Sequence, residues 1–126
     1  MNKQITKSLA LLTAAGITAL STLSIAPAHA TAFAAWEVAN VPWGDVLNVR
    51  KYPSPKSRKQ AAYPNGTVLQ MTGVCTGGVD LQNIAGAPHD WQASRIRYRW
   101  CQVWHDPANN GDYVTGWVYG KYLYPH

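Results

Sequence analysis

Beyond its first thirty residues the chain has no sustained 3.6-residue hydrophobic period, whereas short runs of alternating apolar and polar residues recur between turn signals. Alternation is typical of a strand with one buried face, because successive side chains on a strand point to opposite faces. In residues 46–50, for example, Leu47 and Val49 fall on one face, and Asn48 and Arg50 fall on the other. The sequence therefore predicts an all-β fold.

The first thirty residues have the pattern of a cleaved signal peptide. A positively charged start precedes a weakly apolar run over residues 8–26, and Ala28-His29-Ala30 has the small-x-small cleavage pattern. We expect cleavage after Ala30, which leaves a periplasmic or secreted domain of residues 31–126. An uncleaved membrane anchor is the alternative, and the Thr and Ser residues in the run disfavour it.

The mature part is small and carries the only two cysteines of the chain. Removing 30 of the 126 residues leaves 96, with nine basic and six acidic side chains. This length predicts a single domain. A domain of this size buries only about 60–65% of its unfolded surface, so a cross-link adds needed stability. Export to an oxidising compartment favours pairing Cys75 with Cys101.

The alternation of the two cysteine-bearing segments supports the same pairing. Cys75 shares its face with Leu69 and Met71, and Cys101 shares its face with Val103. We therefore expect a cross-strand disulfide on the inward side of the sheet. Closing a loop of 26 residues stabilises a fold by roughly 3–4 kcal/mol in the chain-entropy description.

Turn signals divide the remaining sequence. Pro64-Asn65-Gly66 and residues 107–111 predict turns, because glycine tolerates the positive φ that such turns need. Residues 76–97 show no clear period, are long for a hairpin connection and contain several glycines, so we expect an inserted loop there. About five short strands at this spacing predict a small barrel.

Four short motifs follow one another over residues 36–124. They are Leu47-Asn48-Val49-Arg50 with Pro53-Ser54, Pro64-Asn65-Gly66-Thr67-Val68, Trp100-Cys101-Gln102-Val103, and Gly116-Trp117-Val118 with Tyr122-Leu123. In this order they resemble the bacterial SH3 (SH3b) domains. The resemblance implies a small, partly open SH3-like barrel with a binding role at the cell wall or envelope, no catalysis and no cofactor. The chain departs from the family pattern at Tyr52, where the family often has glycine, and in the longer insertion.

Aromatic residues gather on the outward faces of two predicted neighbouring strands. Trp100 and Trp104 lie opposite Cys101 in the alternation, and Tyr113 and Trp117 share a face of the following run. Exposed Trp and Tyr side chains stack on sugar rings or hold extended peptides. The alternative is that residues 76–97 fold over these outward-facing aromatic side chains. Trp91 and Ile96 would then pack with them in a second small core.

The resemblance implies that a ligand-binding groove has one wall at the C-terminal end of the barrel. Tyr119, Tyr122 and Tyr124 cluster at that end. We therefore expect groove residues among the aromatic side chains of the strands and loops. Trp117 falls inside a fold-defining motif and is interpreted as structural. Our candidate ligand-binding residues are Tyr52, Trp91, Trp104, Tyr119, Trp100 and Trp43.

The sequence contains little that indicates a catalytic site or a metal site. Cys101 and His105 share a strand face, but an exported cysteine seldom stays a free thiol, so a small hydrolase is the less favoured hypothesis. The pairs His89-Asp90 and His105-Asp106 have no recognised metal-ligand spacing. Carboxylates are scattered, without the pairing that glycosidases use. We therefore expect no enzymatic activity and no metal.

Basic residues concentrate in two places. Arg50, Lys51, Lys56, Arg58 and Lys59 surround one loop, and arginines alternate near residues 95–99. Export and a modest net charge of +3 argue against nucleic acid. Peptidoglycan or another anionic envelope polymer fits the charges better, and a merely solvated face is an equal alternative for the lysine-rich loop. The second functional hypothesis is a protein-interaction module, such as a small accessory subunit or inhibitor of an envelope protein complex.

Overall fold

The computed structural model describes residues 34–126, so the predicted signal peptide and its cleavage site lie outside the described residues. The strands and helices follow one another in the order β1 (Ala34–Val38), β2 (Leu47–Arg50), β3 (Lys59–Tyr63), β4 (Val68–Cys75), η3 (Thr76–Gly78), β5 (Val79–Asp80), α2 (Leu81–Ile84), α3 (His89–Ile96), β6 (Trp100–His105), β7 (Val114–Tyr119), η4 (Gly120–Tyr122) and β8 (Leu123–Pro125). Here η denotes a 3-10 helix. The fold is mostly β, as the alternation predicts, but it is not all-β.

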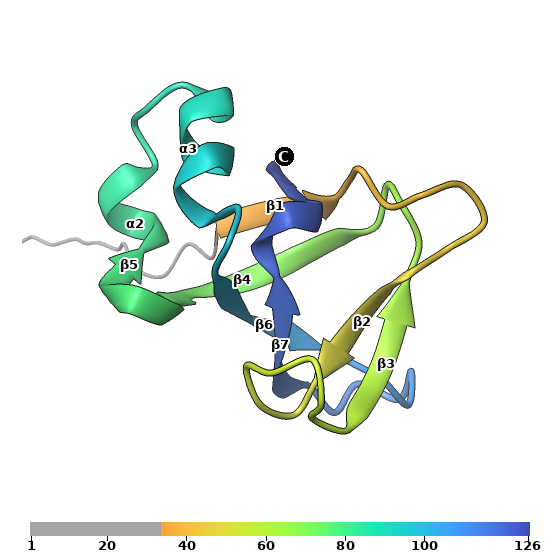
Figure 1. Cartoon of the computed structure of the whole chain (residues 1–126). Coiled ribbons are helices and arrows are strands. Elements are labelled where there is room, and N and C mark those ends of the chain that lie inside the picture. The colour runs from red at the N-terminus through yellow and green to blue at the C-terminus, as the bar shows by residue number, and fades with distance from the viewer. Residues whose placement is uncertain (1–33) are drawn as a thin grey trace, which may run out of the picture. The chain divides into compact units, whose positions relative to one another are not determined.

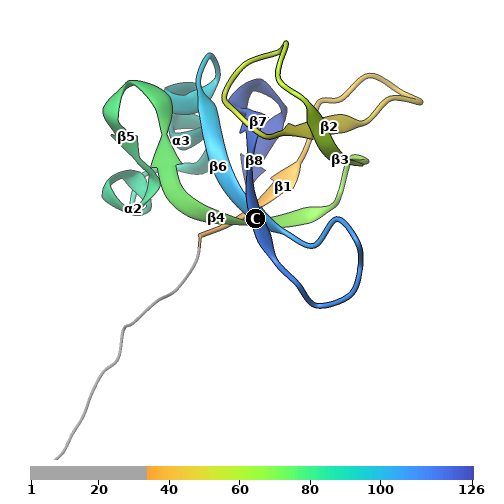
Figure 2. The ribbon, with the colours of Figure 1, turned by 90° about the horizontal axis from the view of Figure 1, so that it is seen from below.

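The strands form one open antiparallel sheet in the order β3-β2-β7-β6-β4-β1-β8, with β5 paired to the end of β4. Residues 34–126 contain eight strands where the turn spacing predicted about five, because short strands such as β5 and β8 have too few residues to show alternation. The β2–β3 hairpin joins the rest of the sheet through a single register pair, Arg50 with Trp117. Figures 1 and 2 show this hairpin at one end of the sheet and the two helices at the other.

A bend in β4 curls the sheet around its core. The register with β6 shifts between the pair Met71–Val103 and the pair Cys75–Cys101, so β4 has extra residues there. Gly73, inside this stretch, has φ 105°, a backbone conformation that favours glycine. Such a bulge bends a strand and increases its twist, which lets one long strand pair with β1, β5 and β6.

The core is built from the residues that the alternation placed inward. Leu47 and Val49 in β2 and Leu69 and Met71 in β4 are all at most 5% exposed, and Val103 in β6 is fully buried. Trp36 in β1, Val118 in β7 and Leu123 in β8 join them in the same cluster. The inward faces of the predicted runs are thereby confirmed.

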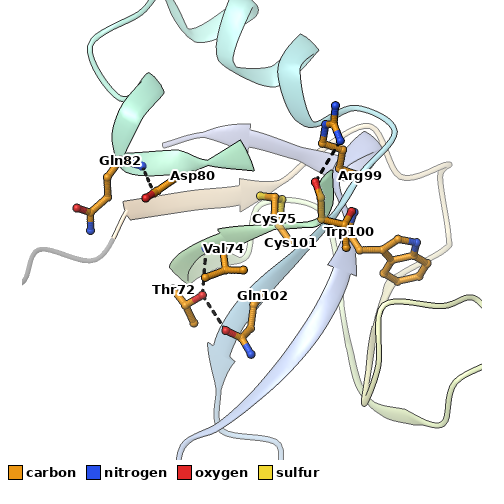
Figure 3. The surroundings of a disulfide bond; sticks show 10 residues. Thr72, Val74, Cys75, Asp80, Gln82, Arg99, Trp100, Cys101 and Gln102 are labelled. Carbon is orange, nitrogen blue, oxygen red and sulfur yellow. Dashed lines mark hydrogen bonds between the residues drawn. A yellow bond between two sulfur atoms is a disulfide. The ribbon is translucent and has the colours of Figure 1, made fainter. Parts of the chain in front are cut away.

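The predicted disulfide is confirmed and lies on this inward side. Cys75 and Cys101 are direct register partners, their Cα atoms are 4.0 Å apart, and both side chains are buried. Figure 3 shows the bridge between β4 and β6, with the side chains of Thr72 and Gln102 hydrogen-bonded on neighbouring positions at 3.0 Å. The bridge fastens the strands at the two ends of the insertion.

The prediction of an inserted loop at residues 76–97 is wrong, because this segment folds into η3, β5, α2 and α3. Asp80 begins α2 by accepting a hydrogen bond from the backbone N–H of Gln82 at 2.9 Å. Leu81 and Ile96 anchor the helices in the main core, where each is at most 1% exposed. The helices are four and eight residues long, too short to show a helical period in the sequence. No helix in the described part of the chain is long and apolar enough to cross a membrane.

Candidate functional site

An open groove of about 600 Å³ lies where the β1–β2 loop and the loop of residues 51–58 approach the outward face of β6 and β7. It is lined by Val41, Pro42, Asp45, Val46, Leu47, Asn48, Arg50, Pro55, Trp100, Tyr119 and Tyr122. Most of these side chains are apolar or aromatic, and the charged ones are a single acid and a single cation. A concave apolar surface with a few polar groups is the general form of a binding site.

Three aromatic side chains form one side of this groove. Trp100 begins β6 and is the register partner of Tyr119 in β7, and their ring centroids are 5.3 Å apart. Tyr122, in the 3-10 turn η4, adds a third ring 6.4 Å from Tyr119. All three are half-buried, so their edges pack on the fold while part of each ring meets solvent. We call Trp100, Tyr119 and Tyr122 the aromatic trio.

The β1–β2 loop also lines the groove and is held in place by hydrogen bonds. The Asn65 side chain accepts from the backbone N–H of Val41 at 3.0 Å and donates to the carbonyl oxygen of Val41 at 2.9 Å. Residues 42–45 then form a turn closed by a hydrogen bond from the Asp45 N–H to the Pro42 carbonyl at 3.0 Å, with Gly44 at φ 81°. A loop fixed in this way loses little conformational entropy when a ligand binds.

Gly120 allows the aromatic trio to assemble. Its N–H donates to the Arg99 carbonyl oxygen at 2.8 Å, which joins the start of η4 to the segment just before β6. A Cβ at this position would overlap the backbone carbonyl oxygen of Ile96. Only glycine permits this close approach, and Tyr119 and Tyr122 flank the point of contact.

Two charged side chains face the groove without an ionic partner in the described chain. Arg50 donates through Nη1 to the neutral carbonyl oxygen of Ser57 at 2.9 Å. The Asp45 carboxylate accepts one hydrogen bond, from the backbone N–H of Val46 at 2.8 Å. The one ion pair among residues 34–126 is formed by Glu37 and His126, at 3.4 Å.

The inward-facing His105 is buried, belongs to a polar cluster whose other members are half-buried, and does not line the groove. Its Nδ1 lies 2.9 Å from the Tyr63 hydroxyl, and its Nε2 lies 2.9 Å from Oε1 of Gln60. Neutral His105 satisfies both contacts by accepting from Tyr63 and donating to Gln60. This cluster connects β3 to β6, while Cys101, on the same face, has its sulfur in the disulfide and is not a thiolate.

We expect the stability of the domain to fall as the pH drops below about 6.5. Burial lowers the pKa of His105 below its ordinary value of 6.5, an effect that Asp106 partly offsets. Between the two pKa values the unfolded chain binds more protons than the folded one, so the His105 contribution is full above pH 6.5 and declines on acidification. Chemical denaturation at a series of pH values from 5.5 to 7.5 measures this slope.

A His105→Gln variant should lose most of that slope, whereas His89→Gln, on α3, should keep it because it leaves His105 and its hydrogen-bond partners unchanged. Equal slopes for wild type and His105→Gln would show that another group is responsible.

The structure brings two of the candidate residues to the groove and places the others elsewhere. Trp100 and Tyr119 line it. Trp43 is fully exposed at the tip of the β1–β2 loop, next to the lining residue Pro42. Tyr52 is 61% exposed on the loop after β2, Trp91 is 47% exposed on α3, and Trp104 lies half-buried at the far end of β6. The insertion does not form a second core over Trp100 and Tyr119, because Ile96 joins the main core.

Sequence reasoning did not select Tyr122, Asp45 or Arg50 as site residues. Tyr122 had a signal, since it follows Tyr119 by three positions in the C-terminal aromatic cluster. Arg50 also had a signal, because it belongs to the basic group at residues 50–59 that fits an anionic envelope polymer. No group of three or more potential metal ligands occurs among residues 34–126.

No family model, no curated protein and no solved structure matches this chain.

Proposed function

We propose that this is an exported, non-catalytic binding module with an SH3-like barrel, and that its groove binds an extended peptide of the cell envelope, with the peptidoglycan stem peptide as first candidate. The observation that carries the proposal is an open groove that is lined by the aromatic trio and by a hydrogen-bonded loop. The resemblance of the four sequence motifs to SH3b domains supports the fold and the wall ligand.

The strand arrangement is compatible with a partly open barrel. One bent strand, β4, pairs with β1 on one side and β6 on the other, and a 3-10 turn precedes the last strand. The chemistry on the inward side favours binding over catalysis, because the Cys101 sulfur is bonded to Cys75 and His105 is buried with hydrogen-bond partners on both ring nitrogens.

Purified oxidised domain should pellet with isolated peptidoglycan sacculi, and Trp100→Ala should weaken that binding about tenfold or more, as expected for loss of a central aromatic contact. Trp104→Ala is the matched control. Both residues are half-buried Trp side chains on the outward face of β6, but only Trp100 lines the groove. A melting curve for each variant confirms that it is folded.

The other outcomes discriminate between surfaces. Loss of pelleting by Trp104→Ala alone would move the site to the far end of the outward face and contradict the groove proposal. If wild type, Trp100→Ala and Trp104→Ala pellet equally and salt weakens the binding of all three, the site is the basic loop of residues 51–58.

The second candidate is a protein partner in the envelope. Trp43 is fully exposed at the tip of a hydrogen-bonded loop, and Trp is the residue type most enriched at energetic hot spots of protein interfaces. Failure of the wild-type domain to pellet with sacculi would favour this candidate.

A further inference from the structure

The two charged side chains of the groove bear on its ligand chemistry, which rests on the proposed function. The relevant observation is that the groove is lined by two side chains of opposite charge, Asp45 and Arg50, and that neither is neutralised by an ionic partner in residues 34–126. A neutral, purely apolar ligand would leave both charges facing its surface and would remove part of their hydration at a cost.

Each charge keeps unused capacity for hydrogen bonds. In Asp45 the described hydrogen bond engages Oδ1 only, with the Val46 N–H as donor. In Arg50 it engages Nη1 only, with the carbonyl oxygen of Ser57 as acceptor. A guanidinium has five N–H donors in a planar fork that suits a carboxylate, and a carboxylate accepts readily from an ammonium group.

The two groups come from different segments of the groove lining. Asp45 ends the turn of the β1–β2 loop, and Arg50 ends β2, so they are five positions apart along the chain. Five residues of extended chain span at most roughly 18 Å, which is the reach of a peptide of about four or five extended residues.

The surroundings of the two groups differ in charge. Lys51, Lys56, Arg58 and Lys59 follow Arg50 in the β2–β3 hairpin, and no acidic residue occurs between positions 46 and 79. The surroundings of Arg50 are therefore positively charged, whereas Asp45 provides a negatively charged carboxylate. This asymmetry favours one orientation of a dipolar ligand.

We propose that the groove selects a short zwitterionic peptide, with an ammonium group at Asp45 and a carboxylate at Arg50. The aromatic trio contacts the backbone and small side chains between these two groups. A peptidoglycan stem peptide that contains a diamino acid and a free carboxyl terminus carries both charges within this upper limit of about 18 Å.

The test uses the oxidised domain and a probe with one charge of each sign, N-acetyl-L-Ala-D-isoGln-L-Lys-D-Ala-D-Ala. Two derivatives each lack one charge: one is acetylated on the lysine amine, and the other ends in a carboxamide. Calorimetry or fluorescence titration should show each derivative binding about tenfold more weakly than the parent, as expected for loss of a hydrogen bond between charged groups.

Two variants assign these losses to residues. Asp45→Asn should weaken binding of the parent about tenfold but leave binding of the acetylated derivative nearly unchanged, and Arg50→Gln should do the same for the carboxamide. Asp112→Asn and Lys51→Gln remove one charge each outside the groove and should have little effect. Because the derivatives change the ligand alone, the result stands even if a variant perturbs the fold.

Affinity that is insensitive to acetylation and amidation overturns the inference. So do variant effects that are equal for the parent and its derivatives. If the parent probe does not bind while sacculi still pellet the domain in a Trp100-dependent manner, the zwitterion inference is wrong and the groove proposal stands. If the parent probe binds and Trp100→Ala has no effect, the groove itself is the wrong site.

Discussion

Replacing both Cys75 and Cys101 with alanine should lower the free energy of unfolding by about 3–4 kcal/mol. The disulfide closes a 26-residue loop that contains the helices α2 and α3, and without it the unfolded chain gains the entropy of that loop. Small domains are stable by only about 5–15 kcal/mol, so the expected loss is a large share of the total. Alanine is preferred to serine because both positions are buried and a hydroxyl would lack a partner. Guanidinium denaturation of oxidised wild type and of the double variant measures the difference.

Reductant provides the control for this prediction. It should shift the denaturation midpoint of the wild-type domain toward that of the double variant and leave the variant unchanged. Equal stability of the oxidised and reduced wild-type domain would show that the packing of Leu81 and Ile96 holds the insertion without the bridge.

Gly120→Ala should destabilise the domain by about 3 kcal/mol and abolish ligand binding in the groove. The added Cβ would overlap the carbonyl oxygen of Ile96 and approach its carbonyl carbon to 2.8 Å and the Arg99 oxygen to 3.1 Å. All three obstacles are backbone atoms, so no side-chain rotation relieves the clash. Either the end of α3 or the turn η4 must move, and η4 carries Tyr122. Thermal melting and sacculus pelleting report the two effects.

Gly86→Ala is the matched control for that substitution. A Cβ at Gly86 meets no atom within 4 Å, so this variant should keep wild-type stability within about 0.5 kcal/mol and full binding. A Gly120→Ala variant as stable as Gly86→Ala would contradict the close approach of η4 to the end of α3.

The strand faces and the disulfide could be predicted because each depends on a local rule. Alternation placed Leu47, Met71 and Val103 inward, and the same alternation put Cys75 and Cys101 on facing inward positions. A one-residue error in register would have exposed all of these side chains, so the pattern leaves little freedom.

The insertion shows where such local rules fail. Residues 76–97 contain helices of four and eight residues, and a single buried residue in α2 shows no period. These helices are stabilised by tertiary contacts, since isolated helices of this length are marginal in water. Leu81 and Ile96 reach the core, and the Gln92 side chain donates to the carbonyl oxygens of Ala85 and Ala87. The order of apolar and polar residues in the sequence does not predict these tertiary contacts.

From its amino-acid pattern alone, this chain could be predicted to form a β-rich sheet with known inward strand faces and a bond between Cys75 and Cys101. Those properties follow from the two-residue repeat of a strand, which acts between neighbours along the chain. The three-dimensional arrangement was needed to see that Trp100 and Tyr119 share a groove with Arg50 and Asp45. It also places Trp91 and Trp104 outside that groove. The physical reason is that the groove combines loops and strands whose proximity is set by the strand order and by the bend at Gly73, not by their separation in sequence.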